Sequence, residues 1–188
     1  IRDRVESEVL RETQLVVCLL FQYAGMSFVD FAHLKERNIK NGILDYNRQK
    51  TGTPMRLEIL DTAELMRKEL MGDKRPASGY LFPFLSGTKT GYEAYLEYNA
   101  ALSRFNRNLK ALKKAAGIAS DVTSYTIRHS FAMALKEQNV PIEMISELLG
   151  HKSIKTTQIY LRSFSLEKMT EVNSTCFGCV YNYVSKVG

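Results

Sequence analysis

The chain has 188 residues, a length within the range of a single domain that can bury its own hydrophobic core. Its 45% hydrophobic and 24% charged residues are ordinary for a globular protein, and its longest unbroken apolar run, residues 15–21, is too short to span a bilayer. Three cysteines favour a reducing cytoplasm over a disulfide framework, and a net charge of +6 mildly favours an anionic partner. Because the chain begins with Ile1 and its helical pattern starts within a few residues, we expect it to be part of a longer protein.

Two helices are expected at the start of the chain. Apolar residues at helical spacing run through residues 6–24, and Gly25 is placed to end that pattern. A shorter helix is expected over residues 27–34, with the side chain of Ser27 as its N-cap.

A β-hairpin is expected next. Residues 42–48 and 54–60 alternate apolar and polar side chains, and the turn between them contains Gly52. This pattern puts Lys50 near the tip of the hairpin. A helix over residues 61–71 follows.

The rest of the chain is predicted to be mainly helical. The expected elements are a short strand or extended segment at residues 80–84 and helices at residues 93–116, 124–138, 141–149 and 155–162. Pro141 is expected in the first turn of its helix, and Gly150 follows the last turn. Residues 163–188 have weaker signals and predict a tail with one more helix. A mostly helical chain with one small antiparallel sheet is an α+β fold.

The side chains that could carry chemistry lie in the last third of the chain. Arg128 is followed by His151, which precedes Tyr160 by nine residues, and each alone is most simply a packing or surface residue. Phosphodiester cleavage without a metal needs a nucleophile, cations on the phosphate oxygens and an acid for the leaving alkoxide. Tyrosine can be such a nucleophile. The sequence has no dense Asp/Glu cluster to hold magnesium ions, so cationic side chains would have to serve.

Three motifs, in order, are similar to those of one known family. Residues 149–160 read Leu-Gly-His-Lys-Ser-Ile-Lys-Thr-Thr-Gln-Ile-Tyr, residues 128–132 read Arg-His-Ser-Phe-Ala, and residues 50–52 read Lys-Thr-Gly. Over residues 5–161 the chain resembles the catalytic domain of the tyrosine recombinases, the phage integrase family. It looks most like a subset seen in Bacteroides-type mobile elements.

The resemblance implies a role for each motif residue. Tyr160 would attack the scissile phosphate and become a 3′-phosphotyrosine, while Arg128 and His151 hold the phosphate oxygens. Lys50 would protonate the leaving 5′-oxygen. The same chemistry in reverse rejoins a different DNA end, so neither a metal, ATP nor another cofactor is expected.

The resemblance also implies an organisation and partners. Residues 1–162 would form the catalytic domain of a site-specific integrase or invertase, without the family's N-terminal core-binding domain. Residues 163–188 would form a C-terminal segment that packs on a neighbouring protomer. The full-length protein would form a tetramer on double-stranded DNA, associated with the bacterial nucleoid.

Two positions depart from the family pattern. Ser27 stands where the family has its first arginine, and Tyr125 stands where a histidine is usual. Serine cannot supply the charged, bidentate fork of arginine. Arg48, two residues before Lys50 and on the same strand face if alternation holds, is the best candidate to replace the lost cation. The alternative is a recombinase-derived DNA-binding protein with impaired catalysis.

Two further groups have less specific signals. Cys176 and Cys179 form a C-x-x-C pair, but a zinc site needs four ligands and no second pair exists, so we expect ordinary tail cysteines. Basic residues along the helix at residues 93–116 form either a solvated face or contacts to DNA phosphates. The candidate contacts are Arg107, Lys110 and Lys114, with Arg104 and Lys113 beside them.

Overall fold

The computed structural model describes residues 8–74 and 79–161, without the side chain of Tyr160. The described elements are α1 (Glu8–Gln22), α2 (Phe28–Ala32), η2 (Glu36–Asn38), β1 (Ile39–Lys40), β2 (Ile43–Asn47), β3 (Pro54–Glu58), α3 (Asp61–Met71), α4 (Gly91–Ala115), α5 (Ser124–Glu137), α6 (Ile142–Leu148) and α7 (Ile154–Tyr160). This confirms the mostly helical α+β fold. None of these helices combines the length and hydrophobicity needed to cross a membrane. The helix expected within residues 163–188 and the cysteine pair lie outside the described residues.

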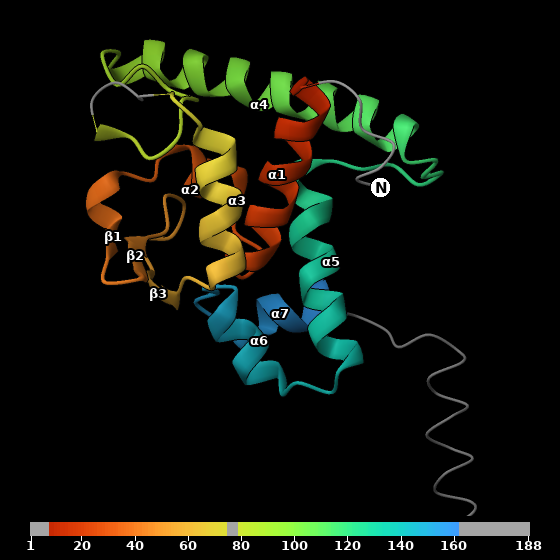
Figure 1. Ribbon diagram of the computed structural model, residues 1–188. Coiled ribbons are helices and arrows are strands. Elements are labelled where there is room, and N and C mark those ends of the chain that lie inside the picture. The colour runs from red at the N-terminus through yellow and green to blue at the C-terminus, as the bar shows by residue number, and fades with distance from the viewer. Residues whose placement is uncertain (1–7, 75–78, 162–188) are drawn as a thin grey trace, which may run out of the picture.

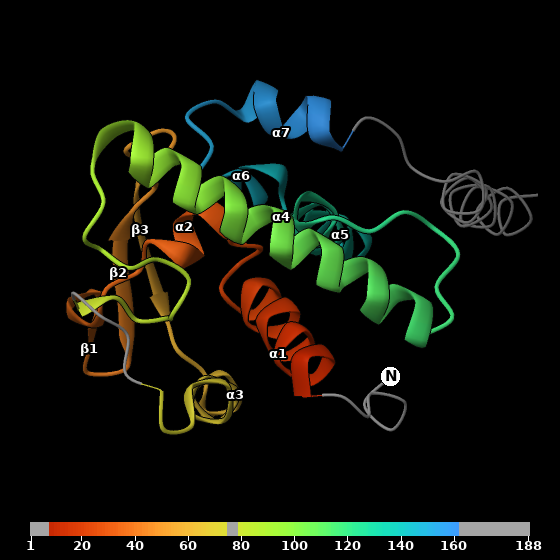
Figure 2. The same cartoon turned by 90° about the horizontal axis from the view of Figure 1, so that it is seen from above.

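The main hydrophobic core lies between α1 and the helices α3, α4 and α5. Helix α1 packs against α3, α4 and α5, and α4 also covers α2. Figure 1 shows α4 lying across one end of the molecule, with α6 and α7 at the opposite end and the small sheet to one side. Seen from above in Figure 2, α4 runs diagonally across the front of the molecule, and α3 is viewed nearly end-on.

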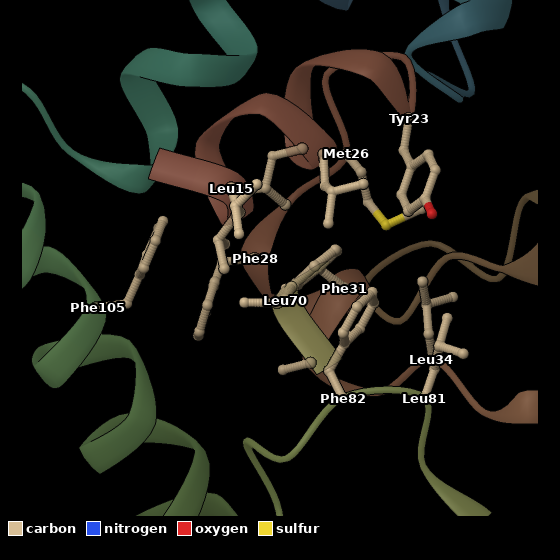
Figure 3. Close-up of a cluster of buried hydrophobic side chains, with 14 of the residues drawn as sticks. Leu15, Tyr23, Met26, Phe28, Phe31, Leu34, Leu70, Leu81, Phe82 and Phe105 are labelled. Atoms are coloured by element: carbon tan, nitrogen blue, oxygen red, sulfur yellow. The ribbon is translucent and has the colours of Figure 1, made fainter. Parts of the chain in front are cut away.

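Aromatic rings fill the space between α2, α4 and the segment before α4. Phe28 stacks on Phe105 with ring centroids 4.6 Å apart, and Phe31 stacks on Phe82 at 4.1 Å. Phe84 contacts both Phe28 and Phe31. Figure 3 shows Phe105 reaching from α4 toward Phe28, beside the Phe31–Phe82 pair. Fixed ring pairs of this kind hold α2 rigidly in place, so the side chains that α2 presents to its other neighbours have defined positions.

The sheet is a three-stranded antiparallel meander in the order β1-β2-β3. The predicted hairpin is confirmed, with Tyr46 paired to Met55 and Asn47 paired to Pro54 at its end. The two-residue strand β1 was missed, since so short a segment has no readable alternation. The segment at residues 80–84 forms only one isolated bridge, between Tyr80 and Lys35, and is not a regular strand.

Helix α5 has a capped start, whereas the starts of α6 and α2 differ from the sequence prediction. Thr123 caps α5, and its side chain accepts a hydrogen bond from the Thr126 amide, as N-cap threonines do. Pro141 is the N-cap residue of α6 instead of lying in its first turn, because its ψ of 140° is extended. Ser27 precedes α2 as expected, but its side chain does not cap the helix.

A second, smaller hydrophobic cluster lies between α5, α6 and the residue that follows α7. Its buried members are Ala132, Ile145, Leu149 and Leu161, with Phe131 packed against them. They come from α5, α6 and the residues that directly follow α6 and α7. This cluster therefore fixes the region between His151 and Tyr160 against α5.

Candidate active site

Arg128 lies inside the protein on α5 with 6% of its surface exposed. One Nη donates to the Gly25 carbonyl oxygen at 2.9 Å, and the other donates to the Leu149 carbonyl oxygen. The second Nη also lies 3.4 Å from Nε2 of His151. The guanidinium thus joins the end of α1 to the loop between α6 and α7, two segments more than a hundred and twenty residues apart in the chain.

Arg48 reaches the same carbonyl from the sheet side. Its Nη1 donates to the carbonyl oxygens of Leu149 at 3.0 Å and Gly150 at 3.2 Å. Arg48 and Arg128 therefore both donate to the Leu149 oxygen, which puts two permanent positive charges side by side in a buried site. Arg48 thus lies beside Arg128 and contacts the start of the motif at residues 149–160.

A buried carboxylate balances part of this charge. Asp30, on α2 and 2% exposed, pairs with Nε of Arg48 at 3.3 Å. It also accepts hydrogen bonds from the Ser27 hydroxyl at 2.5 Å and from the Gln49 amide at 2.7 Å. Ser27, at the position of the missing family arginine, thus orients the carboxylate that holds Arg48.

Gly150 is required where these groups meet. Its φ of +60° lies in the left-handed region, which favours glycine. A Cβ at this position would lie 2.4 Å from Sδ of Met55 and 2.7 Å from Cδ of Arg48. The glycine of the Leu-Gly-His motif therefore lets the loop close onto the Arg48 side chain.

His151 is half-buried and is held in one tautomer. Because a guanidinium can only donate, Nε2 faces Arg128 with its lone pair, and the ring proton is on Nδ1. That Nδ1 donates to Oγ1 of Thr157 at 2.8 Å, and Thr157 is fully buried. Burial, followed by the positive charges of Arg128 and Arg48, lowers the pKa of His151 to about 4, so the ring is neutral at pH 7.

The other motif residues lie on the same elements as this cluster, in the β2–β3 turn, on α5 and on α7. Lys50 is exposed on the turn between β2 and β3, and the expectation that it shares a strand face with Arg48 is wrong because β2 ends at Asn47. Tyr125 is 63% exposed and lies one turn before Arg128 on α5. Tyr160 is the last residue of α7, nine residues after His151.

The basic residues of α4 share its outer surface. Arg104, Arg107, Lys110 and Lys114 are exposed, while the inward face buries Phe105 and other apolar residues. Lys113 differs, because it pairs with Asp121 at 3.1 Å.

Sequence reasoning missed Asp30 and Thr157 as parts of the site. Thr157 lies inside the motif at residues 149–160 and Asp30 lies three residues after Ser27, but neither position has a side chain that the chemistry itself requires. A carboxylate close after Ser27 was the available signal for Asp30, since a replacement cation at a buried site needs an anion.

Comparison with known proteins decides the family. A sequence model described as "Phage integrase family" matches residues 3–167. The chain belongs to the phage integrase family. It is 52% identical to the tyrosine recombinase XerD of Lacticaseibacillus casei over 54 residues, which are 29% of this chain and 18% of that protein.

Two solved structures share the fold of this phage integrase family member. The XerA recombinase has a TM-score of 0.63 at 21% identity, covering 91% of this chain and 63% of that one. The XerH site-specific recombinase, in a post-cleavage complex with palindromic difH substrate, has a TM-score of 0.65 at 22% identity over 92% of this chain and 48% of that one. The chain thus spans less than two thirds of these relatives.

Proposed function

We propose that this chain is the catalytic domain of a site-specific DNA recombinase, an integrase or invertase that cleaves and rejoins double-stranded DNA. The observation that carries the proposal is the convergence of Arg48 and Arg128 on one carbonyl oxygen beside His151. When DNA binds and the Leu149 carbonyl oxygen moves aside, a phosphate oxygen takes its place between these donors, and preorganised donors of this kind stabilise the charge that develops during phosphoryl transfer.

The reaction follows from these roles. The Tyr160 hydroxyl gives its proton to a solvent water, and its oxygen forms a bond to phosphorus as the bond from phosphorus to the 5′-oxygen breaks. Lys50 gives a proton to that 5′-oxygen. Arg48 and Arg128 donate to the non-bridging oxygens, and His151 joins them in its other tautomer, in which Nε2 donates to a phosphate oxygen and Nδ1 accepts from the Thr157 hydroxyl. Rejoining runs the same step backward with a 5′-hydroxyl from another strand. The phosphotyrosine bond conserves the energy of the broken one, so no ATP is used.

Arg48 takes the place of the first arginine of the family in this proposal. Its guanidinium is aimed by Asp30, which Ser27 and the Gln49 amide hold in turn. Tyr125, beside Arg128 on the helix, donates a hydrogen bond to the phosphate where most of the family has histidine. Exposed Arg107, Lys110 and Lys114 contact DNA phosphates and position the duplex without reading its sequence.

The assembly that we propose is that of the full-length protein. Residues 1–162 are the catalytic domain and residues 163–188 pack on a neighbouring protomer, giving a tetramer on DNA at the bacterial nucleoid in the cytoplasm. The XerH relative, bound to its difH substrate, supports DNA as the partner.

A suicide substrate tests the proposal. The intact natural protein selects its binding duplex from a random-sequence pool, and that duplex is then nicked at each position in turn, so that cleavage next to a nick releases a short oligonucleotide and traps the adduct. We expect a covalent protein–DNA adduct that disappears in Tyr160→Phe. Arg48→Ala should slow its formation by roughly 10²–10³, as for loss of one preorganised donor. Binding without any adduct would favour the catalytically impaired DNA-binding protein instead.

A further inference from the structure

A buried lysine holds the chain directly after Tyr160. Lys136, near the end of α5, is 8% exposed, and its Nζ donates to the carbonyl oxygen of Leu161 at 2.8 Å. Lysine is almost never this buried without a specific partner, because removing an ammonium group from water is costly. The hydrogen bond from Lys136 to Leu161 therefore compensates the cost of burying the ammonium group, which apolar packing of the helix face alone does not explain.

Leu161 is fixed on three sides. Its amide donates to the Thr157 carbonyl oxygen at 2.9 Å, its carbonyl accepts from Lys136, and its side chain packs beside Ile145 and Leu149. The last carbonyls of a helix have no acceptor role inside the helix and carry a partial negative charge, so an ammonium group there is favourable. Lys136 thus stabilises the end of α7 in one place.

The same helix carries the phosphate-binding arginine. Arg128 and Lys136 are eight residues apart on α5, which is about 12 Å along a helix axis. The N-terminal part of α5 holds the loop of Leu149, and its C-terminal part holds the end of α7. We call Arg48, Arg128 and the Leu149 carbonyl between them the phosphate clamp. Because one helix contacts both the clamp and Leu161, it sets the distance from the clamp to Tyr160, the residue before Leu161.

We propose that Lys136 is a positioning residue that keeps the end of α7, and with it Tyr160, in register with Arg128. This inference rests on the proposed recombinase function. Loss of the contact lets the end of α7 move while the phosphate clamp remains intact. A shift of about 1 Å in a reacting group costs on the order of 10² in rate, so the chemical step is affected and DNA binding is not.

Three variants test the inference in the intact natural protein. Lys136→Met keeps an unbranched side chain of similar length but removes the donor, and Lys136→Arg keeps a donor. Lys68→Met is the matched control, since Lys68 is 66% exposed on α3. We expect Lys136→Met to slow adduct formation on the suicide substrate by roughly 10–100-fold at unchanged DNA affinity. Lys136→Arg should recover at least part of the rate, and Lys68→Met should match the natural protein.

Hydrogen exchange without DNA gives a second readout that does not depend on catalysis. Lys136→Met should raise exchange in residues 154–161 and leave residues 124–132 unchanged. If the natural protein forms no adduct, the recombinase function fails and this exchange pattern alone decides the role of Lys136. Faster exchange throughout α5, weaker DNA binding in parallel with the rate, or an unchanged adduct rate would each overturn the positioning role.

Discussion

Gly150→Ala offers a direct test of the close approach that builds the site. The left-handed backbone at φ +60° costs an alanine about 1–2 kcal/mol. The new Cβ also lies 2.4 Å from Sδ of Met55 and 2.7 Å from Cδ of Arg48, far inside contact distance. Forcing extra volume into a packed site costs about 1–3 kcal/mol, so the free energy of unfolding should fall by roughly 2–5 kcal/mol in total.

Urea unfolding of Gly150→Ala and Gly42→Ala separates these two effects. Gly42 has a similar φ of +76°, but a Cβ there meets nothing within 4 Å, so Gly42→Ala should lose only the backbone part, about 1–2 kcal/mol. Adding Met55→Ala to Gly150→Ala removes the nearer obstacle but makes a cavity of its own, so the double variant should lose less than the two single losses together. Equal losses for Gly150→Ala and Gly42→Ala would refute the close approach of the loop to Arg48.

Three more predictions concern the groups around His151. Thr157→Val leaves the Nδ1 proton of His151 without its acceptor, so the free energy of unfolding should fall by about 1–3 kcal/mol. The same variant should slow adduct formation on the suicide substrate, whereas Thr157→Ser, which keeps the hydroxyl, should retain both the stability and the rate. The folded-state pKa of His151, about 4, lies below its ordinary value of 6.5, so the unfolded chain takes up a proton first as pH falls. The free energy of unfolding should therefore decrease from pH 6.5 toward pH 4, and urea titrations should show a smaller decrease in His151→Asn. Asp30→Asn removes the charged partner of buried Arg48 and should lower the free energy of unfolding, measured in urea, by about 3–5 kcal/mol. An unchanged free energy of unfolding would show that this ion pair does not stabilise the fold.

Much of the fold was readable because local rules decide it. The hairpin turn with Gly52 and the end of the first helix before Gly25 each depend on residues within a few positions, and the structure has both as expected. The Thr123 cap of α5 is an equally local interaction. The motif at residues 149–160 fixed the family because its residue types occur in a defined order, which composition alone does not provide.

The contacts that complete the site could not be predicted in this way. Arg48 meets the Leu149 carbonyl across 101 positions, and Arg128 meets the Gly25 carbonyl across 103. Backbone carbonyls look the same in every sequence, so nothing in the residue types marks these two as acceptors. The strand alternation that suggested a shared face for Arg48 and Lys50 failed because a tight turn begins between them.

The burial of Arg48 and Asp30 as a pair also depends on tertiary packing. Sequence alone permits Arg48 to be a solvated strand residue, and only the placement of α2 beside the hairpin brings its carboxylate within 3.3 Å. Ser27 stands where the family has an arginine, and the sequence did not indicate a role for it in the site. In the structure its hydroxyl orients Asp30.

The attachment point of DNA tests the central proposal most directly. The trapped adduct is digested with nuclease and trypsin, and the peptide that carries a nucleotide is identified by mass spectrometry. Trypsin separates Tyr160, in residues 156–162, from Tyr125, in residues 115–128. The proposed function predicts a 3′-linked nucleotide on Tyr160. A nucleotide on the peptide of Tyr125, or on any other residue, would contradict it.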